Sequence, residues 1–423
     1  MISKEALKNV LLDQEEYILS EIKYIDRDIN LDEYINNNLV TIICGVRRCG
    51  KSTLLKIFLN KIIKNNPHIT YLYCDFSDER LNKFEIDDFQ KIFEILLEKY
   101  KDGKKYFFFD EIQTVNGWEK FVNRMYEKED AKLFITGSNK SLLRSDTSTV
   151  LTGRQKLLEL YPFSFREFLK SKPNNFNILN LTTREKIKLS NYFEEYFQIT
   201  GFPYPLEIKD KRTLQEYFNN ILYKDIISKN KIKQVQEIKD IVLFLANNIG
   251  QIISYGNLCD FSGIKSKSTI KKYINYLKEA YLVFTISKYD KSIRKQILNP
   301  KKIYFIDVGF ARIIGTPSSE NKGWYLENII YLELLRRKKE IYYNKNGNEC
   351  DFLIKNGIII TEAIQSTYEI NNKTKDREIQ GLISALKKYN LKEGTIITRD
   401  QEETIIINGY KIKIVPIYKW LIF

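Results

Sequence analysis

The sequence of 423 residues is poor in the side chains that most often bind metals or form disulfides. Its single histidine, His68, follows Asn65-Asn-Pro67 in an expected turn, so multi-histidine metal sites are excluded and histidine-based catalysis is not expected. Its five cysteines are odd in number and have no paired metal-site spacing, which argues against a disulfide framework and for a reducing, cytoplasmic setting. They are Cys44, Cys49, Cys74, Cys259 and Cys350.

Long apolar segments are also absent. A membrane helix requires roughly 20 apolar residues, and runs such as Ile241–Ala246 are far shorter. The first residues, Met1-Ile-Ser-Lys-Glu, contain no apolar signal core, and no repeat or low-complexity tract occurs. Hydrophobic residues make up 43% of the chain, which is enough for sizeable cores. We therefore expect a globular protein of roughly three domains with no membrane partner.

Acidic residues are fewer than basic residues. The chain has 54 Asp or Glu against 68 Lys or Arg, which gives a formal net charge of +14 and a pI near 9.2. Such a surplus favours a polyanionic partner, and nucleic acid before membrane. The alternative is a biased composition without such a partner, because Lys, Asn and Ile are all abundant here.

Residues 40–140 alternate short β-rich runs with helical stretches, which is typical of a parallel sheet covered by helices. The β-rich runs are almost continuously apolar, as in strands that are buried on both faces. We expect strands at Val40–Cys44, Ile69–Cys74, Tyr106–Phe109 and Leu133–Thr136, with helices at Thr53–Ile63 and Asp88–Tyr100.

The segment Gly45–Ser52 matches the pattern G-x-x-x-x-G-K-[ST] of phosphate-binding loops. Its two glycines allow successive backbone N–H groups to turn inward and form a nest for anions. Lys51 would carry its charge to the β- and γ-phosphates of ATP, and Ser52 would offer its hydroxyl to Mg²⁺. The helix that begins there would direct its positive end at the phosphates. The predicted nucleotide-binding residues are Gly45, Val46, Arg47, Arg48, Cys49, Gly50, Lys51, Ser52 and Thr53.

A second run, Tyr106-Phe-Phe-Phe-Asp110-Glu111, ends a buried strand in two acids, at the edge where α/β sheets bind ligands. Asp110 would hold Mg²⁺, and Glu111 would act as the base that activates the attacking water. An acid without the adjacent glutamate would predict nucleotide binding alone, so this pair favours hydrolysis.

Two further polar positions are candidates for the same site. The strand that ends at Thr136 is followed by Ser138 and Asn139, either of which could orient the water, and the alternative is a capped strand end. Arg154 is a candidate arginine finger that would stabilise the transferred charge, and the alternative is an ordinary surface or ion-pair residue.

Taken together, these motifs resemble those of prokaryotic AAA+ family ATPases that carry a C-terminal domain of unknown function. The resemblance implies an AAA+ core, a helix-turn-helix region and a terminal domain similar to restriction-endonuclease folds, and it implies no particular substrate. The segments that carry it are 45–55, 110–113, 136–139, Gly153-Arg154, Pro162–Phe168, Tyr304–Gly309, Glu327-Asn328, Glu333–Arg337 and Glu349–Ile354.

Residues 211–305 contain 18 Lys or Arg against 7 Asp or Glu, which accounts for most of the net charge. Two expected helices joined by a glycine turn, and then two β-runs, suggest a winged helix that contacts double-stranded DNA. The alternative is a protein-interaction module. The helices are Tyr255–Phe261 and Ser268–Ala280, the second capped by Ser268 or Thr269, and the β-runs are Tyr281–Ile286 and Lys302–Ile306. The candidate DNA contacts are Lys265, Lys267, Lys271 and Lys272.

The C-terminal segment has an incomplete nuclease pattern. Endonuclease-like folds use an acid from a helix, an Asp on one strand and Glu-x-Lys on the next strand to bind Mg²⁺ and activate water. Glu327, Asp351 and Glu362 could supply the acids, but Ile364 stands where the lysine should be. The other register, at Gln365-Ser-Thr367, lacks both the acid and the lysine. We therefore expect a degenerate domain used for binding, although a displaced lysine could preserve catalysis.

Three functions remain open at this stage. The leading hypothesis is an AAA+ type ATPase that uses Mg-ATP and couples hydrolysis to DNA binding or to assembly, which is compatible with a homo-oligomer. The alternatives are an ATP-regulated, metal-dependent DNA nuclease and a nucleotide-gated switch that acts on a protein partner. The expected α/β architecture is a helical lead-in (1–39), a P-loop AAA+ core with a parallel sheet (40–170), a helical lid or linker (171–210), a winged-helix-like basic domain (211–310) and a restriction-endonuclease-like α/β domain (311–423).

Overall fold

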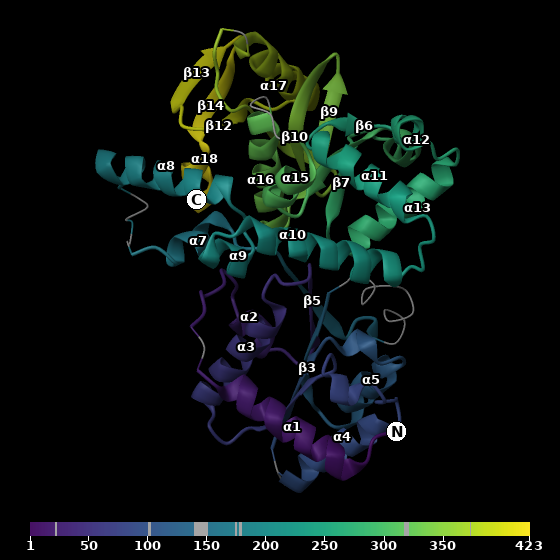
Figure 1. Cartoon of the computed structure of the whole chain (residues 1–423). Helices are drawn as coiled ribbons and strands as arrows, with labels where there is room; N and C mark the ends of the chain where they lie inside the picture. Colours follow the sequence, from purple (N-terminus) through teal and green to yellow (C-terminus); the bar gives the residue numbers. More distant parts are fainter. Residues whose placement is uncertain are drawn as a thin grey trace. The chain divides into compact units, whose positions relative to one another are not determined.

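Two β-sheets organise the chain, one in each of two units, Met1–Tyr161 (unit 1) and Pro162–Phe423 (unit 2). The structure is a computed structural model, and each unit is described by itself (Figure 1). The residues it describes are 1–21, 23–99, 103–138, 151–173, 176, 180–316, 321–372 and 374–423.

The sheet of unit 1 has five strands, all parallel, in the order β2-β3-β4-β1-β5. The expectation of a parallel sheet is therefore confirmed. One strand, β5, was not expected, because only Leu158 and Leu160 of its six residues are buried and its sequence lacks a continuous apolar run. The strands are β1 (Val40–Gly45), β2 (Thr70–Asp75), β3 (Lys105–Asp110), β4 (Lys132–Gly137) and β5 (Gln155–Leu160).

Aromatic side chains fill the core on both faces of this sheet. On one face, Phe107 and Phe109 of β3 contact Phe121 of α5. On the other face, Phe134 of β4 contacts Phe58 of α3. Successive residues of a strand point to opposite faces, so a run of phenylalanines fills both layers at once. The helices are α3 (Lys51–Asn65), α4 (Asp88–Lys99) and α5 (Trp118–Lys128), with short turns η1 (Glu79–Leu81) and η2 (Ile112–Thr114).

The first helix, α1 (Lys4–Leu19), is an integral part of unit 1. Its buried face includes Leu7 and Leu11, and it packs on β2 and α4. Lys4 forms ion pairs with both Glu94 and Glu98 of α4. Helix α1 is therefore one of the layers of unit 1 and not a separate lead-in to it. A short helix, α2 (Asp32–Ile35), follows.

The sheet of unit 2 has nine strands in the order β13-β14-β12-β11-β10-β9-β7-β8-β6. Parallel pairing of Ser287 in β7 with Tyr342 in β9 carries this sheet across residue 310, where a domain boundary was expected. The structure thus joins the two expected C-terminal domains in one sheet. The strands are β6 (Ile252–Ile253), β7 (Val283–Lys288), β8 (Lys301–Phe305), β9 (Glu340–Asn346), β10 (Asn348–Asn356), β11 (Ile359–Ser366), β12 (Glu393–Thr398), β13 (Glu403–Ile407) and β14 (Tyr410–Pro416).

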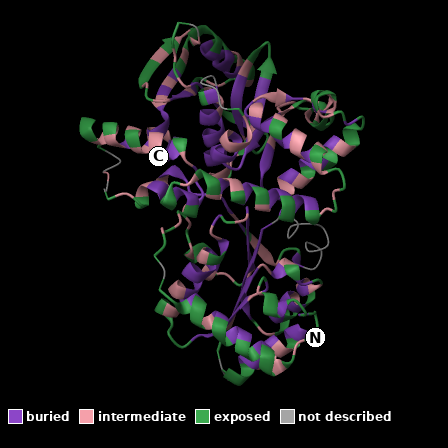
Figure 2. Ribbon diagram, in the orientation of Figure 1, coloured by how far each residue is buried: buried purple, intermediate pink, exposed green. Residues whose placement is uncertain are grey.

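Helices surround this second sheet, and most of its central strands are buried (Figure 2). Helix α13 begins one residue earlier than expected, at Lys267, because the hydroxyl of Ser266 accepts the backbone N–H of Thr269 and caps the helix in place of Ser268 or Thr269. The helices are α7 (Phe165–Lys170), α8 (Thr183–Gln198), α9 (Pro203–Ile208), α10 (Lys211–Asn220), the π-helix η4 (Ile221–Ser228), α11 (Val235–Asn247), α12 (Tyr255–Ser262), α13 (Lys267–Glu279), α14 (Ile293–Leu298), α15 (Val308–Ile314), α16 (Lys322–Arg336), α17 (Lys375–Tyr389) and α18 (Ile417–Ile422). Among the helices of the described residues, none combines the length and the apolar character that crossing a membrane requires.

A buried aspartate ties distant parts of unit 2 together. Asp307, at the start of α15, accepts the backbone N–H groups of Gly201 and Gly309, both at 2.7 Å, and the hydroxyl of Thr200 at 2.9 Å. Burial raises the pKa of this carboxyl, and the hydrogen bonds oppose that rise without cancelling it. The carboxyl thereby fixes the turn at residues 200–201 against α15.

Replacing Asp307 by Ala should lower the free energy of unfolding of unit 2 by about 2–4 kcal/mol, because three buried donors lose their acceptor. Hydrogen exchange of the full chain in urea should show faster exchange at residues 200–201 and in α15. Asp260→Ala, at an exposed acid of α12, is the matched control. Equal exchange in the two variants would contradict the proposed clamp.

Candidate active site

The loop after β1 is built closely against the end of β5. A side chain at Gly45 would clash, because its Cβ would lie 2.2 Å from the carbonyl oxygen of Leu160. Gly50 has a φ of 100° and immediately precedes α3, a conformation that glycine adopts without strain. The two glycines of the motif are thus required for different reasons, one for space and one for backbone conformation.

Lys51 is folded back onto this loop. Its Nζ donates to the carbonyl oxygens of Gly45 and Val46, each at 3.3 Å, and lies 3.6 Å from Glu111 Oε1. The side chain is only 4% exposed. Burial is the largest single effect and would lower the pKa of Lys51, but the surrounding negative groups, Glu111 first, together outweigh it and raise the pKa. The lysine therefore stays cationic at the mouth of the loop.

Asp110 and Glu111 are connected through Thr136 on the intervening strand β4. The hydroxyl of Thr136 donates to Asp110 Oδ1 and accepts the backbone N–H of Glu111 at 3.0 Å. Asp110 is 2% exposed, and this burial raises its pKa to about 6, while hydrogen bonds from Ser52 and Thr136 act in the opposite direction. Because β1, β3 and β4 are parallel, their carboxyl ends bring Ser52, Lys51 and the two acids to one edge.

Glu111 is held in a defined position. Its backbone has a φ of 49°, which is uncommon for a residue other than glycine. Its Oε2 accepts hydrogen bonds from Gln113 at 2.5 Å and from Ser138 at 3.2 Å. Burial favours a higher pKa for Glu111, but the charge of Lys51 and the bond from Gln113 outweigh it and lower the pKa. Ser138 thus lies at the predicted site, whereas Asn139 lies outside the described residues.

Arg154 does not lie at this edge. It immediately precedes β5, and the backbone N–H of Val40 at the start of β1 donates to its carbonyl oxygen. Its guanidinium binds Asn123 at 2.8 Å and Glu127 at 2.5 Å, both on α5. Five or six strand residues separate it from the loop, which is about 20 Å at the usual rise. Arg154 thus lies away from the phosphate loop of its own subunit, and its role as an arginine finger stays a prediction, for the nucleotide of a neighbouring subunit.

Arg27 is a residue that the sequence did not single out. Its guanidinium donates to the carbonyl oxygen of Cys49 at 3.2 Å and to that of Tyr161 at 2.6 Å. It therefore links the phosphate loop to the chain just after β5. A lone arginine in an irregular segment has no sequence signal that would have identified it, whereas Gln113 lies in the segment 110–113 that was noted without a role for this residue.

The four predicted DNA-contacting lysines, Lys265, Lys267, Lys271 and Lys272, are all exposed. They lie on and just before α13, whose opposite face is buried through Ile270, Tyr273, Ile274 and Leu277. The helix therefore separates an apolar packing face from a basic outer face.

Two of the predicted nuclease-like acids do come together, around a lysine that was not expected. Lys302 Nζ of β8 lies 2.8 Å from Glu327 Oε1 of α16 and 2.8 Å from Glu349 Oε1 and Asp351 Oδ1 of β10. Position 364 lacks the lysine as expected, and strand β8 supplies a displaced lysine, Lys302. Burial would lower the pKa of Lys302, but the charges of Asp351 and Glu327 raise it well above its usual value.

The other two predicted residues separate. Glu362 pairs with Ile354 across the β10–β11 hairpin, is exposed and binds Lys339 at 2.8 Å, so its assignment to the site is wrong. Gln365 belongs to the site: its Oε1 accepts the backbone N–H of Asp351 at 3.1 Å, and its Nε2 donates to Glu378 at 2.6 Å. The register that the structure adopts is thus the one in which the acid is replaced by an amide.

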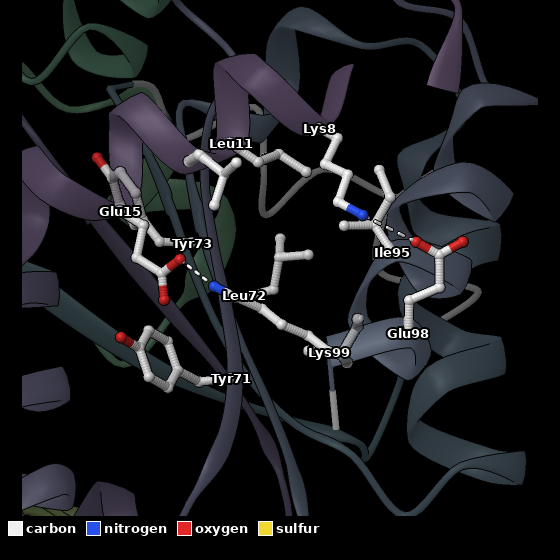
Figure 3. Close-up of a pocket in the computed structure, with 11 residues that line it drawn as sticks. Lys8, Leu11, Glu15, Tyr71, Leu72, Tyr73, Ile95, Glu98 and Lys99 are labelled. Carbon is white, nitrogen blue, oxygen red and sulfur yellow. Dashed lines mark hydrogen bonds and ion pairs between the residues drawn. The ribbon is translucent and has the colours of Figure 1, made fainter. Parts of the chain in front are cut away.

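A small cavity of about 150 Å³ lies elsewhere in unit 1, between α1, β2 and α4 (Figure 3). Leucine, isoleucine and tyrosine side chains form its walls, and the ion pairs Lys8–Glu98 and Glu15–Lys99 lie at its rim. None of the loop or acid residues described above lines it.

Comparison with known families and proteins finds matches along most of the chain. A family model described as an AAA domain matches residues 37–169, and one described as a domain of unknown function (DUF8612) matches residues 190–320. The chain is 35% identical to the uncharacterized protein MJ1544 of Methanocaldococcus jannaschii, over 99% of this chain and 96% of that protein. It is 28% identical to an uncharacterized protein of Haemophilus influenzae, over 98% of this chain and 100% of that protein.

Solved structures match less closely. AMPPCP-bound DnaA from Aquifex aeolicus has 14% identity and a TM-score of 0.28, over 59% of this chain and 86% of that chain. Cdc6p from Pyrobaculum aerophilum has 12% identity and a TM-score of 0.27, over 75% of this chain and 98% of that chain.

The buried carboxyl of Asp110 predicts a pH-dependent stability of the nucleotide-free protein. Its folded-state pKa of about 6 exceeds the unfolded value near 3.9. The folded state therefore binds the proton more tightly, and the stability that this group contributes is present below about pH 4 and lost as the pH rises through about 6. As the pH rises from about 4 to about 7, the unfolding free energy of Asp110→Asn relative to that of the wild type should therefore increase by about 2–3 kcal/mol.

Urea unfolding of the full chain at several pH values, followed by hydrogen exchange in unit 1, measures this difference. Asp87→Asn, at an exposed acid next to α4, is the control and should show a constant difference. A difference for Asp110→Asn that does not change with pH would contradict the assignment.

Proposed function

The chain belongs to the same family as the uncharacterized protein MJ1544 of Methanocaldococcus jannaschii and carries an AAA domain, and from this premise we propose that it binds and hydrolyses Mg-ATP. The observation that carries the proposal is the meeting of Lys51 with Asp110 and Glu111 at the carboxyl edge of a parallel sheet. Phosphate needs a buried cation and inward N–H groups, and hydrolysis needs an acid pair beside them.

Nucleotide binding requires Lys51 to change partners. In the structure it donates to two neutral carbonyls and lies 3.6 Å from one carboxylate. Phosphate oxygens carry more negative charge than carbonyl oxygens, so the β- and γ-phosphates would replace Gly45 and Val46 as its acceptors. The N-terminus of α3 and the loop N–H groups would bind the remaining phosphate oxygens.

A magnesium ion at this site would depend on the nucleotide. Among the described residues, no group of three or more His, Cys, Asp or Glu side chains is arranged to hold a metal ion. Mg²⁺ in phosphate-binding sites takes one or two protein oxygens and completes its shell with phosphate and water. Ser52 and Asp110 supply that kind of partial set, so we infer that the metal enters with ATP.

Glu111 is the candidate general base. Its pKa is kept low by Lys51 and Gln113, so it is ionised and able to accept a proton at neutral pH. The hydrogen bonds from Gln113 and Ser138 hold its carboxylate beside the loop. We assign Gln113 and Ser138 the role of positioning this carboxylate, and Asn139 stays a candidate for orienting the water.

We further propose that hydrolysis is coupled to binding of double-stranded DNA by unit 2. The order α11-β6-α12-α13-β7-α14-β8, with β8 paired to both β6 and β7 and the short helix α14 between β7 and β8, supports a winged-helix-like arrangement. The exposed lysines of α13 would neutralise phosphates of the duplex. Arg154 stays a candidate for acting on the nucleotide of a neighbouring subunit, which would require a homo-oligomer.

Two substitutions at the loop test the assignment of roles. Lys51→Ala should abolish ATP binding, because the phosphates lose their buried cation. Glu111→Gln should retain ATP binding and lower kcat by about 10²–10⁴-fold, the usual contribution of a general base. Phosphate release and fluorescent-nucleotide titration separate the two effects, with Glu79→Gln as an exposed control. Normal hydrolysis by Glu111→Gln would show that another group is the base.

Two substitutions on α13 test the DNA contact. Lys271→Ala with Lys272→Ala should reduce the slope of log affinity against log salt by about 2, one for each lost phosphate contact. The same substitution at two exposed lysines of unit 1, Lys64 and Lys83, should leave the slope unchanged. The ATPase rate should rise with double-stranded DNA and lose that rise at high salt. A rate indifferent to DNA would favour the switch that acts on a protein partner.

A further inference from the structure

An ammonium group lies at the centre of the acidic cluster in unit 2. Lys302 is 1% exposed, and its Nζ contacts three carboxylates at 2.8 Å. An ammonium has three N–H donors, so these contacts use its full donor capacity. The acids come from two elements, Glu327 from α16 and Glu349 and Asp351 from β10. No donor of Lys302 is left for a further partner.

The oxygens that would bind a metal ion in an endonuclease-like fold are already engaged. Glu327 Oε1 also accepts the hydroxyl of Tyr304 at 2.6 Å. Asp351 Oδ2 accepts the backbone N–H of Ser366 at 2.9 Å, while Oδ1 binds Lys302. Gln365 stands where the acid of the second strand would be, and its side-chain amide N–H donates a hydrogen bond to Glu378.

A divalent ion does not fit this arrangement. Mg²⁺ and Ca²⁺ bind carboxylate oxygens at about 2.0–2.6 Å from a shared centre, and Lys302 Nζ occupies that centre at hydrogen-bond distance. Within the part of the chain that the structure describes, no set of three or more acids, cysteines or histidines is arranged to hold an ion. The residues present therefore do not match the metal that the endonuclease-like resemblance implies.

We propose that the ammonium of Lys302 is the built-in cation of this cluster and takes the place of a divalent metal ion. Unit 2 then has no metal-dependent nuclease centre, and its acids serve to hold the sheet together. The cluster joins β8 to α16 and β10, and α16 packs on β8 and β11 of the sheet. A fixed internal charge keeps this junction intact whatever the supply of metal.

The proposal predicts that removing the ammonium creates a metal site. Lys302→Met keeps an apolar stem of similar length but leaves three carboxylates facing one another without a cation. Such a cluster is the donor set that hard divalent ions prefer. Lys302→Arg should stay metal-free, because it retains a positive charge at the centre.

Mn²⁺ titration of the nucleotide-free full chain, read by electron paramagnetic resonance, tests this prediction. The wild type should bind no Mn²⁺ at the cluster, so the wild type and Asp351→Asn should bind the same amount of Mn²⁺. Lys302→Met should gain one bound Mn²⁺ per chain, and Lys302→Met with Asp351→Asn should lose it again. Glu362→Gln is the matched control, since that exposed acid lies outside the cluster and should have no effect on Mn²⁺ binding.

Two results would overturn the proposal: Mn²⁺ binding by the wild type that Asp351→Asn abolishes, or a folded Lys302→Met that binds no more Mn²⁺ than the wild type. If Lys302→Met folds only when Mn²⁺ is present, the proposal is supported. If Lys302→Met folds neither with nor without Mn²⁺, the proposal is tested by comparing Mn²⁺ binding by the wild type with Mn²⁺ binding by Asp351→Asn. No nucleotide is involved, so the outcome is independent of the ATPase proposal.

Discussion

The parallel direction of β1, β3 and β4 is the constraint on which the candidate active site depends. Parallel strands end at the same edge, so the loop after β1 and the acids after β3 meet without any contact close in sequence. Strand β4 lies between them, and its Thr136 joins Asp110 to the backbone of Glu111. An antiparallel β3 would place the two acids at the opposite edge, where Arg154 lies.

Two buried lysines show how the same charge serves opposite purposes. Lys51 has two neutral acceptors at 3.3 Å and a carboxylate at 3.6 Å, so its charge is incompletely balanced and phosphate can compete for it. Lys302 has three carboxylates at 2.8 Å, so a new anion would have to displace an existing strong partner. The number and charge of the partners, and not burial, separates a binding lysine from a structural one.

Local patterns in the sequence were sufficient for the phosphate loop, the first four strands (β1 to β4) and the helices beside them, because each is encoded within a short segment. The sequence could not reveal Arg27 or Lys302, whose partners lie far along the chain. The prediction for Glu362 was wrong because successive side chains of a strand point to opposite faces of the sheet. Phe352 pairs with Ile364, and extending this pairing by one residue places Asp351 opposite Gln365. Glu362, three positions from Gln365, points to the other face.

The continuity of the second sheet changes how unit 2 can respond to a ligand. A winged-helix domain joined by a linker could pivot on its own. Here β7 pairs with β9, and Lys302 on β8, before residue 310, forms ion pairs with Glu327 and Asp351, which follow it. Breaking that junction would expose carboxylates that have lost their cation, at a cost of several kcal/mol. Helix α13, which packs on β7, must therefore move together with the nine-stranded sheet.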